Sequence, residues 1–223
     1  MGLYNRETKL STAILEHPQL IPVVNRLGIM LGVGDMSIGS ICANAHIDPD
    51  FFLSMVNTFL DKDYFPVNSK GTFTLEKTVD YLRRTSEFYK RVQLPNVERH
   101  FNSLLQRSGG NNNLALLQKF FNSVRTRFDE CYAYDNDTLF PSLLSGRVPG
   151  NASLSAEGHF EMEERLHDLL CFFVVHLRGE YDPNLCVAVV TALSSLDKDY
   201  RQNNRIRNRI LTPLMEEMHN NGC

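Results

Sequence analysis

The feature that most limits the fold of this 223-residue chain is a stripe of side chains that recurs at alternating steps of four and three residues near its end. The positions are Val189, Leu193, Leu196, Tyr200, Asn203, Arg207, Ile210 and Leu214. This spacing is typical of an α-helix that buries one face along the seam of a bundle, and it does not fit the two-residue period of a β-strand. Two polar residues, Asn203 and Arg207, interrupt the otherwise apolar stripe.

Four long segments carry such stripes, and together they predict an all-α protein. They cover about 75–107, 114–144, 156–178 and 184–219. The sequences between them, SGGNNN, GRVPGNAS and GEYDPN, are rich in Gly, Asn and Pro and are short enough to join antiparallel neighbours. The simplest arrangement is therefore an up-down-up-down four-helix bundle.

Three short helical segments are predicted in front of the bundle, within about residues 10–62. Ser11 is a candidate N-cap for the first and Ser37 for the second, because a short side-chain oxygen can accept a hydrogen bond from the first free N–H groups of a helix. Asp48 is the candidate cap of the third, with Pro49 at the first helical position.

The stretch DKDYFPVNSKGTF, which is rich in turn-forming residues, separates the short segments from the long ones. We place the domain boundary near Gly71. The chain is thus predicted to hold a small helical domain over residues 1–71 and the bundle over residues 72–223.

Charge and cysteine content limit the partners and the compartment. The chain has 23 Lys and Arg against 26 Asp and Glu, so its net charge of -3 creates no general attraction to nucleic acid or anionic lipid. Its five cysteines are widely spaced and form no CxxC, which favours reduced thiols in a cytoplasmic protein. The apolar stretch 13–24 is interrupted by EHPQ, so we expect neither a signal peptide nor a membrane partner.

Polar residues interrupt the stripes at matched places. Cys131 and Asp135 lie ten and six residues before Pro141, and Asn203 and Arg207 lie ten and six residues before Pro213. The stripe of the second long segment is Leu117, Phe121, Val124, Phe128, Cys131, Asp135 and Thr138. Each of these two segments therefore carries an inward polar pair followed by an apolar turn that ends in proline.

The first and third long segments each carry one inward polar residue. Their stripes are Val79, Leu82, Ser86 and Tyr89, and His159, Met162, Leu166, Leu169 and Phe173. Six polar positions are thus distributed one, two, one, two over four helices. This distribution predicts a polar pocket at the centre of the bundle.

That distribution resembles the ligand layout of hemerythrin-like bundles, which hold a di-iron centre through His, HxxxE, His and HxxxE. The whole chain resembles the iron-sulfur-centre repair proteins (the ScdA and YtfE type), in which a small helical domain precedes such a bundle. The segments that carry the resemblance are LGIMLGVGDMSIGSICANAHIDPDFFLSMVN, VDYLRRTSEFY, CYAYDNDTLFP, HFEMEERLHDLL and NNRIRNRILTP. In place of the paired cysteines that the family commonly shows after Gly-Ile, this chain reads GIMLGVGD.

The resemblance assigns the family's ligand positions to six residues, and only one of them keeps a family ligand type. These positions are Ser86, Cys131, Asp135, His159, Asn203 and Arg207. His159 is unchanged, Asp135 and Cys131 are usable ligands, and the guanidinium of Arg207 repels a metal cation. We therefore expect a degenerate site in which Arg207 pairs with Asp135, because a buried guanidinium needs a partner.

Two readings of function follow from this degenerate site. The first is a non-catalytic regulatory protein that binds a protein partner or senses a small ligand, with no cofactor. The alternative is an iron protein of the stress response or of iron-sulfur repair, with one or two metals held by His159, Asp135, Cys131 and Glu163 and by a carboxylate such as Glu87 or Glu164. His159 and Glu163 form an HxxxE, a spacing that an ordinary surface contact between neighbouring turns also produces.

Other functions find less support in the sequence. SIGSICANAHIDPDFFLSMVN has the outline of a helix-turn-helix, which gives a third function, that of a transcriptional regulator. Its second helix carries no Lys or Arg to reach DNA, so we expect an interaction or homodimer surface there rather than a DNA-binding one. No GxxxxGK[ST], GxGxxG or GxSxG is present, and we do not expect an enzyme. The arginines at 201, 205 and 209 are predicted to line a solvated face.

Overall fold

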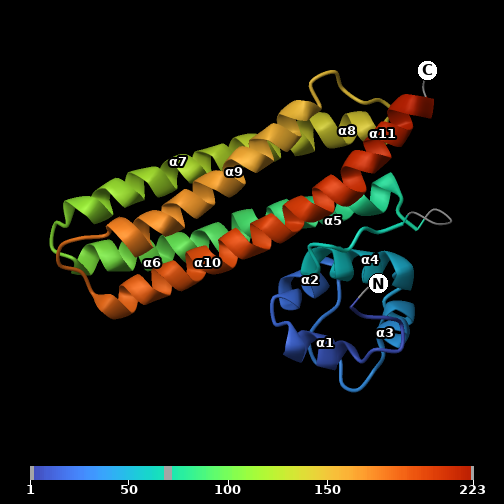
Figure 1. Cartoon of the computed structure of the whole chain (residues 1–223), viewed down its shortest axis with the longest axis horizontal. Coiled ribbons are helices and arrows are strands. Elements are labelled where there is room, and N and C mark those ends of the chain that lie inside the picture. The colour runs from blue at the N-terminus through green and yellow to red at the C-terminus, as the bar shows by residue number, and fades with distance from the viewer. Residues whose placement is uncertain (1–2, 68–71, 222–223) are drawn as a thin grey trace. The chain divides into compact units, whose positions relative to one another are not determined.

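The computed structural model describes residues 3–67 and 72–221, and it confirms the all-α prediction (Figure 1). Within these ranges the only pairing of extended backbone is an isolated antiparallel bridge between Lys9 and Ser37. None of the described helices combines the length and the apolar character that a membrane crossing needs. The boundary predicted near Gly71 lies outside the described residues.

The chain forms two compact units, and the first unit is built from two separate segments of the sequence. It contains residues 1–85 and 202–223, and the second contains residues 86–201. The helices of the first unit are α1 (Leu10–Glu16), α2 (Leu20–Arg26), α3 (Ile38–Asn44), α4 (Pro49–Leu60) and most of α5 (Leu75–Phe88), with the end of α10 (Pro183–Ile206), the π-helical turn η5 (Arg207–Leu211) and α11 (Thr212–Asn221).

The region predicted to hold three short helices holds four, α1 to α4. Pro18 accounts for the extra break: the residue before a proline is pushed out of the helical region, and His17 has φ -131° and ψ 77°. Ser37 caps α3 and Asp48 caps α4, with Pro49 at the first turn, as predicted. The prediction for Ser11 was wrong, since α1 already begins at Leu10, where the Leu10 N–H donates to the Met36 carbonyl beside the Lys9–Ser37 bridge.

Two arginines bind the end of α4 to the last part of the chain. The carbonyl groups of a final helical turn have no partners within their own helix. Arg205 donates to the Thr58 and Phe59 carbonyls at 3.3 and 3.1 Å. Arg209 donates to the carbonyl groups that follow, and its guanidinium lies 4.0 Å from the centre of the Phe65 ring. The expectation of a solvated face was therefore wrong for these two residues, because side-chain spacing alone does not reveal backbone acceptors elsewhere in the chain.

The second unit consists of long helical segments around one apolar cluster. Its elements are η2 (Tyr89–Gln93), α6 (Leu94–Arg107), α7 (Asn112–Tyr134), η3 (Asp135–Leu139), α8 (Phe140–Leu144), α9 (Ser153–Cys171), η4 (Phe172–His176) and α10 up to residue 201. Figure 1 shows α6, α7, α9 and α10 running side by side. Each contributes to the shared core, for example through Leu104, Phe121, Leu166 and Leu193.

Three of the long helices contain a π-helical turn just before a proline. The turns η2, η3 and η5 begin at Tyr89, Asp135 and Arg207, and each begins six residues before Pro95, Pro141 or Pro213. A proline inside an α-helix has no N–H to donate, and its ring clashes with the carbonyl group four residues earlier. A wider turn removes that clash, so the matched spacing seen in the sequence corresponds to matched irregular turns.

The extra residue in η3 changes which side chains face inward after it. Thr138 continues the predicted four-and-three stripe but is exposed, whereas Leu139 and Phe140 are buried. A residue inserted into a helix rotates everything beyond it by about 100°. The stripe prediction thus holds as far as Asp135 and was wrong for Thr138.

We expect that replacing Arg209 with Ala will destabilise the chain by about 1 to 3 kcal/mol, because several backbone carbonyl groups lose a charged donor. Urea unfolding measures the loss, and hydrogen exchange should accelerate selectively at residues 58–65. Arg91→Ala is the matched control, since Arg91 forms only an exposed ion pair with Glu87, and it should change stability by less than about 0.5 kcal/mol. Equal effects of the two substitutions would contradict this role for Arg209.

Asp48 is expected to contribute a pH-dependent part of the stability. Burial alone would raise its pKa, but the N–H groups of Asp50 and Phe51 and the charge of Lys77 outweigh burial and bring the pKa below 3.8. A lowered pKa means that the contribution is present above pH 3.8 and is lost as the pH falls through the folded-state pKa.

Asp48→Ala should therefore cost about 1 kcal/mol near neutral pH, through loss of the cap. Asp48→Asn keeps a capping oxygen and should cost less, while making unfolding less dependent on pH. Urea unfolding at about pH 6 and about pH 3 compares the variants. An unchanged pH dependence in Asp48→Asn would contradict the assignment.

Candidate functional site

The six polar residues predicted to face inward are all buried. Ser86, Cys131, Asp135 and His159 belong to the second unit, whereas Asn203 and Arg207 belong to the first. Asp135 is 0% exposed and His159 is 2% exposed. A buried carboxylate and a buried imidazole each require hydrogen-bond partners, so their contacts determine what the site can do.

Asp135 and His159 contact each other and form the centre of a polar cluster in the second unit. His159 Nε2 lies 2.8 Å from Asp135 Oδ2, and the Ser155 hydroxyl donates to Asp135 Oδ1 at 2.6 Å. On the other side of the imidazole, His159 Nδ1 lies 2.6 Å from the Tyr200 hydroxyl. We call Ser155, Asp135, His159 and Tyr200 the buried polar cluster.

The direction of the hydrogen bonds depends on the protonation of these groups, and we assign it for an ionised carboxylate and a neutral imidazole. An ionised carboxylate can only accept, so His159 Nε2 carries a proton and donates to Asp135. In a neutral imidazole the other nitrogen is then an acceptor, and Tyr200 donates to His159 Nδ1. Both carboxylate oxygens and both ring nitrogens are thus engaged by protein groups.

Three helices supply the cluster, and the π-helical turn η3 positions its carboxylate. Asp135 is the first residue of η3, Ser155 and His159 are one turn apart on α9, and Tyr200 lies on α10. Sequence reasoning found Asp135 and His159 but assigned no polar role to Ser155 or Tyr200. The signals were available: Tyr200 is a member of the α10 stripe, and Ser155 lies four residues before His159.

Aromatic rings surround the buried polar cluster. The Tyr132 ring meets the His159 ring edge to face at 5.2 Å between centres, and the Tyr200 ring lies 5.1 Å from Phe128 and 5.7 Å from Tyr89. Because these rings exclude water, the hydrogen bonds of the cluster lie in a medium of low dielectric constant, which strengthens them.

Cys131 and Ser86 line two separate cavities of the second unit. Cys131 and Ser155 line a cavity of about 340 Å³, where the Cys131 sulfur lies so close to Gly158 that a Cβ at that position would be 3.0 Å from it. Ser86 accepts a hydrogen bond from Asn136 at 3.4 Å, and both residues line a cavity of about 270 Å³. Tyr132, which packs on His159, also lines this second cavity.

The cavity beside Cys131 has a charged rim. Arg127 lies 3.0 Å from Glu161, and Arg165 pairs with the same carboxylate at 2.8 Å. The hydrogen bond from Arg165 is the largest cause of a lowered Glu161 pKa, and Arg127 lowers the pKa further against the opposing effect of burial. Glu161 is therefore a carboxylate held by two guanidinium groups.

The first unit holds the remaining two predicted positions. Asn203 accepts a hydrogen bond from the Tyr81 hydroxyl at 2.9 Å, and Arg207 is the first residue of η5. The expected ion pair between Arg207 and Asp135 joins residues of different units and stays a prediction.

The residues proposed for a metal site do not gather in the structure. Asp135 and His159 are in contact, but Glu163 pairs with Arg201 at 3.3 Å and Glu87 pairs with Arg91 at 2.6 Å. Throughout the described ranges, no three His, Cys, Asp or Glu side chains are arranged so that they could hold a metal ion. The residues present thus do not fit a di-iron centre.

Comparison with known proteins adds no assignment. No protein-family model matches this chain, and a search of curated proteins gives no match either.

The buried polar cluster is expected to stabilise the second unit as a coupled set. Asp135→Asn and His159→Gln should each cost about 1 to 3 kcal/mol or more, because each leaves a buried group without its partner. The double variant should cost less than the sum of the two, by about 0.5 to 3 kcal/mol in a double-mutant cycle of urea unfolding.

Asp137→Asn is the matched control for this cycle, because Asp137 is exposed and lies on the same π-helical turn as Asp135. It should change stability by less than about 0.5 kcal/mol. Strict additivity of the Asp135 and His159 substitutions would show that the two residues do not depend on each other.

Proposed function

We propose that this chain is a degenerate relative of the hemerythrin-like iron-sulfur-centre repair proteins, built as an up-down-up-down four-helix bundle with a small helical domain in front of it. In this proposal it acts as a non-catalytic regulatory protein that senses a small ligand or binds a protein partner. The matched polar positions of the sequence and the all-helical fold support the relationship.

The observation that carries the proposal is the closed hydrogen bonding of Asp135 and His159. A metal ligand must offer a lone pair to the ion, through a neutral imidazole nitrogen or a carboxylate oxygen. Here Ser155 and His159 engage the two carboxylate oxygens, and the two imidazole nitrogens are engaged by Asp135 and Tyr200. The cluster is thus arranged to satisfy its own polar groups rather than to hold an ion.

The two cavities of the second unit support a ligand-sensing role. Ser155 belongs to the buried polar cluster and also lines the cavity beside Cys131, while Tyr132 connects His159 to the cavity beside Ser86. A small molecule in either cavity would touch a residue in contact with the cluster. Such a ligand could change the hydrogen bonds of the cluster without any chemical reaction.

The alternative function is that of a metal-binding protein of the stress response or of iron-sulfur repair. The contact between Asp135 and His159 favours it, because carboxylate and imidazole are both iron ligands and they already lie together. Binding a metal would require the imidazole to exchange its hydrogen bond for coordination. It would also require a third ligand, such as Glu163, to leave its ion pair with Arg201.

Metal content separates the two functions. We expect the protein, expressed with iron supplied and purified without chelator, to contain far less than one iron per chain and to lack visible absorption. Elemental analysis and an absorption spectrum measure this. His159→Gln serves as the comparison: its metal content should equal that of the unaltered protein. Stoichiometric iron that disappears in His159→Gln would establish the alternative.

A further inference from the structure

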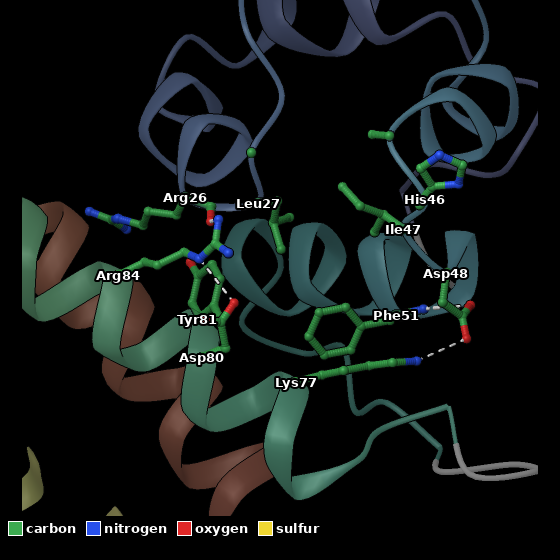
Figure 2. A pocket seen from close by; sticks show the side chains of 12 residues that line it. Arg26, Leu27, His46, Ile47, Asp48, Phe51, Lys77, Asp80, Tyr81 and Arg84 are labelled. Carbon is green, nitrogen blue, oxygen red and sulfur yellow. Dashed lines mark hydrogen bonds and ion pairs between the residues drawn. The ribbon is translucent and has the colours of Figure 1, made fainter.

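The first unit contains a cavity that neither the buried polar cluster nor the proposed function uses. Its volume is about 370 Å³, and it lies between the segment after α2, the turn between α3 and α4, and the side of α5 (Figure 2). Every residue that lines it belongs to the first unit. Charged side chains occur on both sides of an apolar centre, an arrangement that suits a small molecule with both apolar and charged parts.

Two buried aromatic rings form the apolar part of the cavity. Phe51 is 5% exposed and Tyr81 is 1% exposed, and Leu27 and Ile47 are further apolar lining residues. The Tyr81 hydroxyl donates to Asn203, which fixes the orientation of the ring. Such rigid rings can pack against a flat apolar group at low entropic cost.

Two cations beside the rings have donors available to a ligand. Figure 2 shows the guanidinium of Arg84 reaching toward the Arg26 carbonyl and the amino group of Lys77 extending past Phe51 toward Asp48. Both contacts are long, at 3.5 Å. Arg84 Nε pairs with Asp80 at 2.9 Å, which leaves its terminal nitrogens free of any short hydrogen bond among the described residues.

The carboxylates of the cavity are more fully engaged than its cations. Asp48 accepts from the backbone N–H groups of Asp50 and Phe51 as the cap of α4, and Asp80 pairs with Arg84. The terminal nitrogens of Arg84 can therefore donate to an anion, and its planar guanidinium suits a carboxylate or a phosphate.

A residue in the left-handed conformation lies at the edge of the same cavity. His46 has φ 55°, and it is the one non-glycine residue with a positive φ in the described part of the chain. This conformation ends α3 in a standard capping motif, in which the N–H groups of His46 and Ile47 donate to the carbonyl groups of Ala43 and Cys42. An imidazole at this position can donate to an anion.

We propose that this cavity binds a small organic anion, a carboxylate or a phosphate ester attached to a flat apolar ring. The anionic group lies against the guanidinium of Arg84, and the ring packs on Phe51 and Tyr81. The proposal goes beyond the function proposed above and does not depend on it, since it concerns a different unit and would stand even if the second unit held iron.

The test measures binding to the full chain by isothermal titration calorimetry and ligand-detected NMR with four probes. Benzoate and phenyl phosphate carry the proposed anion on a ring, benzylamine has the same ring with a positive charge, and inorganic phosphate has the charge without the ring. Benzoate or phenyl phosphate should bind, and whichever binds more tightly identifies the anionic group. Benzylamine should not bind, and inorganic phosphate should bind at least about tenfold more weakly than phenyl phosphate.

Three variants locate the binding. Arg84→Gln should raise the dissociation constant about tenfold or more, the effect of losing one charge-assisted hydrogen bond, whereas Lys77→Gln, on the other side of the apolar centre, should raise it by less. Arg91→Gln is the matched control, because Arg91 forms the same kind of exposed ion pair one turn apart as Arg84 but lies outside the cavity, and it should leave binding unchanged within about twofold. Because the side chains of Arg84 and Lys77 are 52% and 42% exposed, the variants should fold, which circular dichroism verifies.

The proposal is overturned if neither ring-bearing anion binds, if benzylamine binds as tightly as benzoate, or if inorganic phosphate matches phenyl phosphate. It is also overturned if Arg84→Gln binds the ring-bearing anions as tightly as the unaltered chain does. Measurable iron in the second unit would contradict the function proposed above and would leave this proposal standing.

Discussion

The hydrogen bond between Asp135 and His159 is the contact on which the interior of the second unit depends. A carboxylate removed from water must be surrounded by donors, and this requirement joins η3, α9 and α10 at one point through Ser155, His159 and Tyr200. Apolar stripes alone allow neighbouring helices to shift by a turn at small cost, because one leucine replaces another. A directional cluster does not allow such a shift, so it selects one register.

Much of the fold could be predicted from the sequence because it depends on local spacing. The apolar stripes located the long helices, and the burial of Ser86, Cys131, Asp135, His159, Asn203 and Arg207 followed from their places in those stripes. Three features could not be read in this way. The π-helical turns change which side chains face inward, as the exposed Thr138 shows. Arg205 and Arg209 donate to carbonyl groups more than a hundred residues away along the chain. Ser155 gains its role from its contact with Asp135, which the spacing of its own helix does not reveal.

In the candidate site, residue type predicts which side chains could be metal ligands, whereas geometry decides which groups they contact. The sequence identified His159, Asp135 and Cys131 as usable ligands among the six positions, and the structure brings His159 and Asp135 into contact. Residue type does not say whether a lone pair faces a cation or a proton donor. Here the hydrogen bonds decide it, because Ser155 donates to Asp135 and the Tyr200 hydroxyl contacts His159. The same pair of residues with apolar neighbours in those two places would be a different kind of site.

Arg205 and Arg209, which bind the end of α4, affect when the first unit can be completed during synthesis on the ribosome. Helices α1 to α4 are synthesised before the second unit, yet the carbonyl groups of Thr58, Phe59 and Tyr64 receive their donors from Arg205 and Arg209, which follow the second unit in the sequence. At ordinary elongation rates of about 5 to 20 residues per second, roughly 140 further residues must be added first, a delay of several seconds or more. The first unit therefore stays incomplete until the whole of the second has been synthesised.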